Sequence, residues 1–83
     1  MDAPDIATAR VDREVDARGL NCPLPILRTK KALNDMESGQ TLRVLATDPA
    51  SVRDVQAFSR QTGNALVGHG EREGAFWFVL KRR

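Results

Sequence analysis

The only cysteine of the chain, Cys22, lies in the stretch GLNCPLPIL, where Pro23 and Pro25 follow it. A thiolate can attack an electrophile or carry a second sulfur atom, so this is the residue that could do chemistry. The next residues, ILRTKKALNDM, have the spacing of a helix. Prolines are tolerated in the first turn of a helix, where N–H groups have no intrahelical partner. We therefore expect Cys22 to be the N-cap, with Pro23 at the first helical position and Pro25 at the third.

An N-cap position favours the thiolate form of Cys22. The helix dipole places partial positive charge at this end, the Leu24 N–H is expected to be free to donate to the sulfur, and Arg18 and Arg28 are near in sequence. Cysteines in such surroundings have pKa values lowered from about 8.5 to roughly 3.5–7.5. The alternative is a small buried apolar residue, which is a common role of free cysteine. The two prolines at a loop-to-helix junction favour the reactive interpretation.

Few other residues could take part in chemistry. The only histidine, His69, lies between two glycines near an expected hairpin, and we interpret it as a surface or turn residue. One cysteine and one histidine argue against a closed zinc site within the chain, so we predict no metal and no cofactor. Without a base or a deep cavity, Cys22 is expected to be a carrier that depends on partner enzymes. Whether the chain is an enzyme in its own right stays open.

The composition indicates one small domain. The chain has 83 residues and a formal net charge of +2, which is too small an excess to argue for nucleic acid. No apolar run approaches the roughly 20 residues that span a bilayer, and the polar start MDAPDIATARVDRE has no apolar signal core. A lone cysteine fits a reducing cytosol. We predict a disordered tail over residues 1–10, one domain over residues 11–83, and a cytoplasmic monomer that binds neither membrane nor nucleic acid directly.

Hydrophobic periodicity predicts six elements in the order β-α-β-α-β-β. They are a strand over residues 11–17, a helix over 23–36, a strand over 41–47, a helix that Asp48 caps and Gly63 closes, a strand over 64–70 and, after a turn at 71–74, a strand over 75–81. Two helices cannot cover both faces of such a sheet. We therefore predict an α+β two-layer sandwich, with both helices on one face of a four-stranded mixed sheet.

Side-chain spacing assigns faces to these elements. On the first helix, four residues are expected to face inward, namely Ile26, Thr29, Leu33 and Met36, and four outward, namely Leu24, Arg28, Lys31 and Asp35. Gly39 is expected to stop that helix, and Phe58 of the second is expected to fill the core. On the last strand the set Phe76, Phe78 and Leu80 is expected to face the helices. Trp77 and Val79 are then expected to form an outward patch for partners.

Two motifs at this spacing make the sequence resemble a known family. The first is Cys22-Pro23-Leu24-Pro25, within DARGLNCPLP; the second is Asp48-Pro49-Ala50, followed by Arg53 and Asp54 at the start of the second helix. The chain resembles the TusA family of sulfur carriers, also called SirA-like, over about residues 15–82. The resemblance implies a β-α-β-α-β-β sandwich. It also implies that Cys22 accepts sulfane sulfur as a persulfide from a cysteine desulfurase or a rhodanese-type enzyme and passes it to an acceptor protein.

The resemblance also implies roles for neighbouring residues. Those expected to support the persulfide site are Gly19, Pro23, Leu24 and Pro25. Those expected to dock partners are Arg18, Arg28, Lys31, Asp48, Arg53 and Asp54. In the best-known branch the sulfur ends in 2-thiouridine of tRNA; other branches serve sulfur oxidation, molybdenum cofactor assembly or selenium metabolism. Some members of the tRNA relay have an acidic residue between the prolines, where this chain has Leu24 and hence an apolar spot beside the sulfur.

Two other functions remain open from the residues. The basic end Lys81-Arg82-Arg83 fits a small RNA-binding module, but no aromatic platform beyond Trp77 accompanies it. A thiol redox module would need a resolving thiol from another molecule. A Cys22→Ser variant separates these functions, because RNA binding would survive that substitution and sulfur transfer would not.

Overall fold

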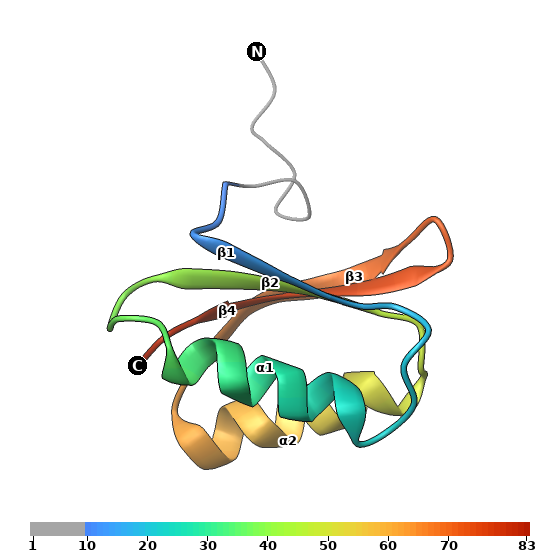
Figure 1. Cartoon of the computed structure of the whole chain (residues 1–83), viewed down its shortest axis with the longest axis horizontal. Coiled ribbons are helices and arrows are strands. Elements are labelled where there is room, and N and C mark those ends of the chain that lie inside the picture. Colours follow the sequence, from blue (N-terminus) through green and yellow to red (C-terminus); the bar gives the residue numbers. More distant parts are fainter. Residues whose placement is uncertain (1–9) are drawn as a thin grey trace.

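The computed structural model of the chain describes residues 10–83, and the tail expected over residues 1–10 lies almost entirely outside the described residues. The described part forms two layers, a sheet and a pair of helices (Figure 1). The elements are β1 (Arg13–Ala17), α1 (Leu24–Asn34), β2 (Thr41–Ala46), α2 (Ala50–Thr62), β3 (Ala65–Arg72) and β4 (Ala75–Lys81). The predicted element order and the α+β sandwich are confirmed.

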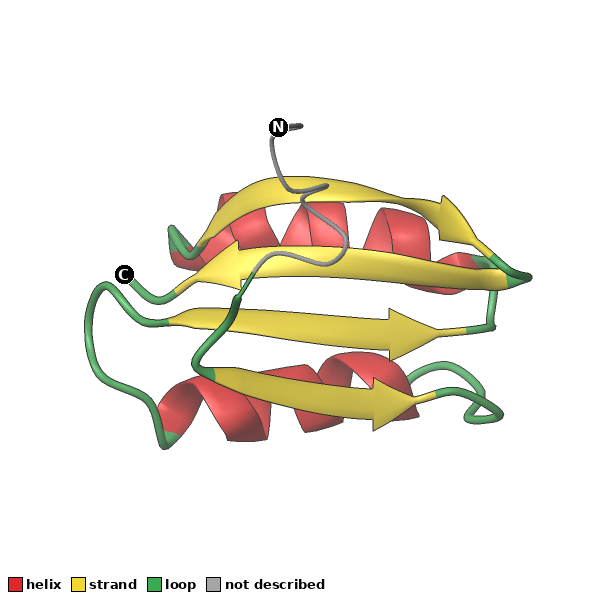
Figure 2. Cartoon of the chain, turned by 90° about the horizontal axis from the view of Figure 1, so that it is seen from above, coloured by secondary structure: helices red, strands yellow, loops and turns green. Residues whose placement is uncertain are grey.

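The sheet is mixed, and its strand order is β1-β2-β4-β3. Strand β1 pairs parallel to β2, whereas β4 pairs antiparallel to both β2 and β3. Both helices lie on the same face of the sheet, as Figure 2 shows from above. Because β1 and β2 run in the same direction, the loops that follow them leave the sheet at the same edge. This arrangement brings the segment before α1 next to the segment before α2.

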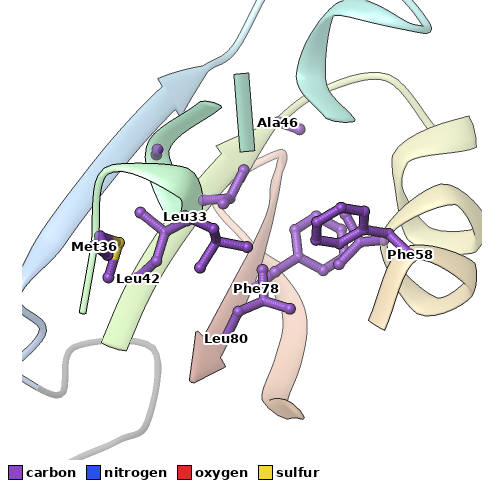
Figure 3. Close-up of a cluster of buried hydrophobic side chains, with 10 residues drawn as sticks. Leu33, Met36, Leu42, Ala46, Phe58, Phe78 and Leu80 are labelled. Atoms are coloured by element: carbon purple, nitrogen blue, oxygen red, sulfur yellow. The ribbon is translucent and has the colours of Figure 1, made fainter. Parts of the chain in front are cut away.

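The core lies between the helices and the sheet (Figure 3). Strand β2 alternates partly exposed and buried residues along its length, so that Leu42, Val44 and Ala46 face the helices. Phe58 of α2 is 9% exposed and packs with the buried Phe78 of β4, which confirms its expected core role. The inward and outward faces of α1 are as predicted.

Helix α1 is shorter than expected, because it starts at Leu24 and ends at Asn34 rather than spanning residues 23–36. Gly39, with φ of 89°, lies in the following loop and does not end the helix. The end is set by hydrogen bonds instead. The Asp35 N–H donates to Ala32 O and the Met36 N–H donates to Leu33 O, both at 3.1 Å, and the Arg82 guanidinium also donates to Leu33 O, at 2.9 Å. A side chain from the end of the sheet thus satisfies a carbonyl at the helix terminus.

The β3–β4 hairpin also differs from the expectation. Strand β3 continues to Arg72, which pairs with Ala75, so the turn is Glu73-Gly74 rather than residues 71–74. Both turn residues have positive φ, 53° and 80°. Two such residues form the tight turn whose twist matches the flanking strands. The hairpin is therefore longer, and its turn shorter, than composition alone indicated.

The sheet face opposite the helices is less open than predicted. Val79, expected to be outward-facing and exposed, is only 3% exposed. Trp77 is half-buried, and its indole lies so close to Gly70 that a Cβ there would be 2.9 Å from the indole nitrogen. The expected partner patch around Trp77 and Val79 is thus wrong for Val79. Within residues 10–83, neither helix has the length and apolar character to cross a bilayer.

Candidate functional site

Cys22 is exposed and lies in the loop between β1 and α1. This loop leaves the sheet at the edge where β1 and β2 both end (Figure 1). The β2–α2 loop holds this segment in place. The Gly19 N–H donates to the Thr47 hydroxyl at 2.9 Å, and the Cys22 N–H donates to Asp48 Oδ2 at 2.6 Å. Gly19 has φ of 80°, a conformation that glycine adopts without strain. The thiol therefore sits on a loop whose backbone is fixed from a second loop.

The start of α1 differs from the expected N-cap geometry. Pro23, not Cys22, is the N-cap, and Leu24 is the first helical residue. The Cys22–Pro23 peptide bond is cis. The Leu24 N–H, expected to be free for the sulfur, donates to Asn21 O at 2.8 Å. Both prolines still lie at the start of the helix, where a backbone N–H would have no intrahelical acceptor. The helix begins at Leu24, one residue later than predicted, and Cys22 lies outside it.

The electrostatic surroundings of Cys22 are the opposite of the expected ones. The thiol donates to Asp54 Oδ2, with 3.3 Å between sulfur and oxygen. That hydrogen bond, followed by desolvation and by the charges of Asp54 and then Asp48, raises the pKa of Cys22 above its ordinary value. The prediction of a lowered pKa is therefore wrong. The hydrogen bond to one carboxylate and the charges of two disfavour the thiolate.

Arg18, expected to support a thiolate, is engaged elsewhere. Its guanidinium makes two hydrogen bonds of 2.8 Å to the two carboxylate oxygens of Asp16. These hydrogen bonds lower the pKa of Asp16 to about 2 and raise the pKa of Arg18. A paired guanidinium of this kind has its charge compensated locally. The pair is a local one, between two exposed side chains two positions apart at the end of β1.

Asp48 joins the Cys22 segment to α2. Its Oδ2 accepts from the Cys22 N–H, while its Oδ1 accepts from the Ala50 N–H at 3.1 Å. Asp48 therefore does bond an N–H at the start of α2, but the predicted cap is one position off, because Pro49 is the N-cap and Ala50 is the first helical residue. One side chain therefore fixes both the start of a helix and the loop that carries the thiol. The second of these contacts was not predicted.

The other residues expected to dock partners lie on exposed surfaces. Arg28 and Lys31 are exposed on the outer face of α1, and Arg53 is exposed on α2. Leu24, which was expected to support the persulfide site, precedes them on α1 and is 45% exposed. A shallow groove of about 580 Å³ between β1 and α1 is lined in part by Arg28, Lys31 and Leu27. The prediction overlooked Leu27, which is 53% exposed. Leu27 directly precedes Arg28, which was predicted to face outward, and this position could have indicated its exposure.

One further residue considered from the sequence, His69, lies in β3. His69 is an exposed residue of β3 whose ring stacks on Phe78, with centroids 6.3 Å apart. Among residues 10–83, no three histidine, cysteine, aspartate or glutamate side chains are grouped so as to hold a metal ion.

A two-layer β-α-β-α-β-β domain with one exposed thiol ahead of its first helix is of the SirA-like class. The crystal structure of a SirA-like protein from Desulfitobacterium hafniense superposes with a TM-score of 0.76 and 28% sequence identity, over 83% of this chain and 95% of that one. The sequence model of the family described as sulfurtransferase TusA matches residues 13–82.

Relatives of known name agree with this class. The sulfur carrier protein TusA of Allochromatium vinosum is 60% identical over 74 residues, which are 89% of this chain and 97% of the relative. A putative sulfur carrier protein of Bacillus subtilis is 52% identical over 71 residues, 86% of this chain and 95% of the relative. The chain therefore belongs to the TusA family of sulfur carrier proteins. A sulfur carrier implies a donor and an acceptor of sulfur as partners.

Proposed function

We propose that the protein accepts sulfane sulfur on Cys22 as a persulfide and hands it to an acceptor protein. The observation that carries this proposal is the exposure of the chain's only thiol on a fixed loop at one end of the molecule. A partner can reach such a thiol, and no second cysteine competes to resolve a persulfide into an internal disulfide.

Loading would proceed by thiol attack on a donor persulfide, R–S–SH. The Cys22 sulfur, having lost its proton, bonds to the terminal sulfur of the donor, and the bond between the two donor sulfurs breaks. The electron pair leaves with the donor's own sulfur, which takes up a proton. The net exchange converts Cys22–SH and R–S–SH into Cys22–S–SH and R–SH, with no external oxidant. Unloading to an acceptor thiol is the same exchange in reverse roles.

The donor class that fits is a cysteine desulfurase or a rhodanese-type enzyme, since both present a persulfide on a cysteine. We propose that the outer face of α1, with Leu24, Arg28 and Lys31, contacts these partners, together with Arg53 on α2. This surface combines exposed apolar area with positive charge, a combination suited to a transient interface. The acceptor belongs to the tRNA 2-thiouridine relay or to another sulfur-trafficking route. We place the carrier in the cytoplasm, as a monomer, where a free thiol stays reduced.

The test is the intact mass of the purified protein after incubation with a cysteine desulfurase and cysteine, or with a rhodanese and thiosulfate. We expect a gain of roughly 32 Da, one sulfur atom, which a reductant removes. The Cys22→Ser variant should gain nothing. If folded protein with a titratable thiol acquires no sulfur from either donor, the persulfide proposal is refuted. The donor that loads Cys22 then indicates which pathway to test next.

A further inference from the structure

We propose that Asp54 is a positioning residue that holds the resting Cys22 as a hydrogen-bonded thiol and keeps the free carrier unreactive until a partner engages this carboxylate. This inference rests on the proposed function and concerns the control of the same site. Its starting point is the 3.3 Å contact between Cys22 Sγ and Asp54 Oδ2, which joins residues 32 positions apart.

The contact is fixed from both sides rather than being a chance meeting of two mobile side chains. Asp54 lies within α2 and is only partly exposed. The Cys22 backbone is tied to Asp48, which also bonds the first residue of α2. Thiol and carboxylate are thus attached to the same structural unit, the start of α2. A hydrogen bond between fixed partners loses less side-chain entropy than one between mobile ones.

Within residues 10–83, the two charges that raise the pKa of the Cys22 thiol are those of carboxylates, and both oppose its ionisation. Asp54 faces it from α2, and Asp48 faces it from the β2–α2 loop. On its own segment the cation expected to favour the thiolate was Arg18, whose guanidinium is bonded to Asp16. A carboxylate that accepts from a thiol favours the neutral form and repels the thiolate. The free protein therefore has the opposite arrangement to that of an activated catalytic cysteine, which is paired with a cation.

This arrangement suits a carrier that must not react outside its complexes. A thiol kept protonated is slow to alkylate, to oxidise and to exchange with unrelated disulfides. A partner that places a lysine, arginine or protonated histidine against Asp54 neutralises the carboxylate and releases the thiol for attack. The matching feature expected on the donor is a cation beside its persulfide. The same repulsion turns the anionic terminal sulfur of a loaded carrier away from α2, towards solvent.

The experiment measures the rate of iodoacetamide alkylation of Cys22 from about pH 6 to about pH 11, a range that brackets the ordinary cysteine pKa of about 8.5. Asp54→Asn keeps the shape and removes the charge, so the midpoint should fall. Each pKa unit by which this midpoint falls gives about ten times more thiolate at neutral pH, but the less basic thiolate is about threefold less nucleophilic. The net expectation is about a threefold faster reaction per unit. A merely structural role would not move this profile.

Two matched variants separate position from charge. Asp54→Glu retains a carboxylate and should stay close to the wild-type midpoint. Glu37→Gln removes one exposed negative charge from the loop after α1 and should leave the profile unchanged. The inference is overturned if the Asp54→Asn profile coincides with wild type, or if Glu37→Gln shifts it equally.

A measurement on the unaltered protein covers the case in which Asp54→Asn fails to fold. The chemical shift of the Cys22 β-carbon, followed against pH, should titrate with a midpoint above about 8.5. An ordinary or lower midpoint would refute the inference. Neither measurement uses a sulfur donor, so failure of the persulfide proposal and failure of this inference are distinguishable.

Discussion

Replacing Asp48 with alanine removes two hydrogen bonds that join the Cys22 segment to α2. Asp48 Oδ2 accepts from the Cys22 N–H at 2.6 Å, and Oδ1 accepts from the Ala50 N–H at 3.1 Å. The first closes a loop between residues 26 positions apart, and the second satisfies an N–H at the start of a helix. Alanine can accept neither, and water can replace them only in part because the side chain is partly buried.

The structure sets the size of the expected loss. A hydrogen bond to a charged group is worth about 1.5–3 kcal/mol, and loss of a helix cap about 1 kcal/mol. Because Asp48 is partly exposed, we take the lower half of the range and expect a loss of about 2–3 kcal/mol. For a domain of this size, that lowers the melting temperature by roughly 10–20 °C. Asp48→Asn retains one acceptor oxygen and should lose about half as much.

Urea unfolding followed by the fluorescence of Trp77, the only tryptophan, measures this loss. The matched control is Asp35→Ala, which removes an exposed carboxylate whose nearest cation, on Arg13, is 3.9 Å away. Such a surface pair contributes about 0–1 kcal/mol. If Asp48→Ala costs no more than Asp35→Ala, the two hydrogen bonds do not hold the loop, and the account of the site given above fails.

Three further changes test other parts of the structure. Phe58→Ala should cost about 3–5 kcal/mol in urea unfolding, because it empties a core position that is 9% exposed; a loss under about 1 kcal/mol would contradict the packing of α2 on the sheet. Gly70→Ala should shift the Trp77 emission and cost about 1–2 kcal/mol, since the new methyl would lie 2.9 Å from the indole nitrogen; an unchanged spectrum would show that the indole lies elsewhere. Arg18→Ala should raise the Asp16 pKa from about 2 towards 3.8 in a carboxyl NMR titration. In the unaltered protein the stabilising effect of this pair is complete above the ordinary aspartate pKa and declines as the pH falls towards about 2. If the titration midpoint of Asp16 is the same in Arg18→Ala as in the wild type, the two side chains are not paired.

The fold follows from local patterns. The period of the apolar residues separated helices from strands, and the inward faces of α1 and β4 were predicted because a core position repeats at the period of its element. Phe58 was assigned to the core correctly for the same reason. Boundaries were less accurate. The end of α1 depends on Arg82, which comes from the far end of the chain, and no local pattern could include it.

The site followed the sequence only in part. The position of Cys22 at a loop-to-helix junction and its exposure agree with the motif. Its electrostatic surroundings do not, because the prediction counted charges near in sequence and omitted those near in space. Asp54 and Asp48 reach the thiol only because β1 and β2 are parallel and end at one edge of the sheet. The predicted pKa of Cys22 did not take this parallel pairing into account, although the pairing would have placed both carboxylates near the thiol.

The hydrogen bond between Cys22 and Asp54 makes the chemical character of the motif a property of the folded chain. A synthetic peptide with the sequence GLNCPLPIL would have an ordinary thiol, since the carboxylates come from a segment that the peptide lacks. A Cys-Pro-x-Pro stretch found in another protein therefore says little until a carboxylate is found at the start of the second helix, the one that corresponds to α2. Engineering this site into a new scaffold would require transplanting two loops in register, together with the parallel strands that hold them.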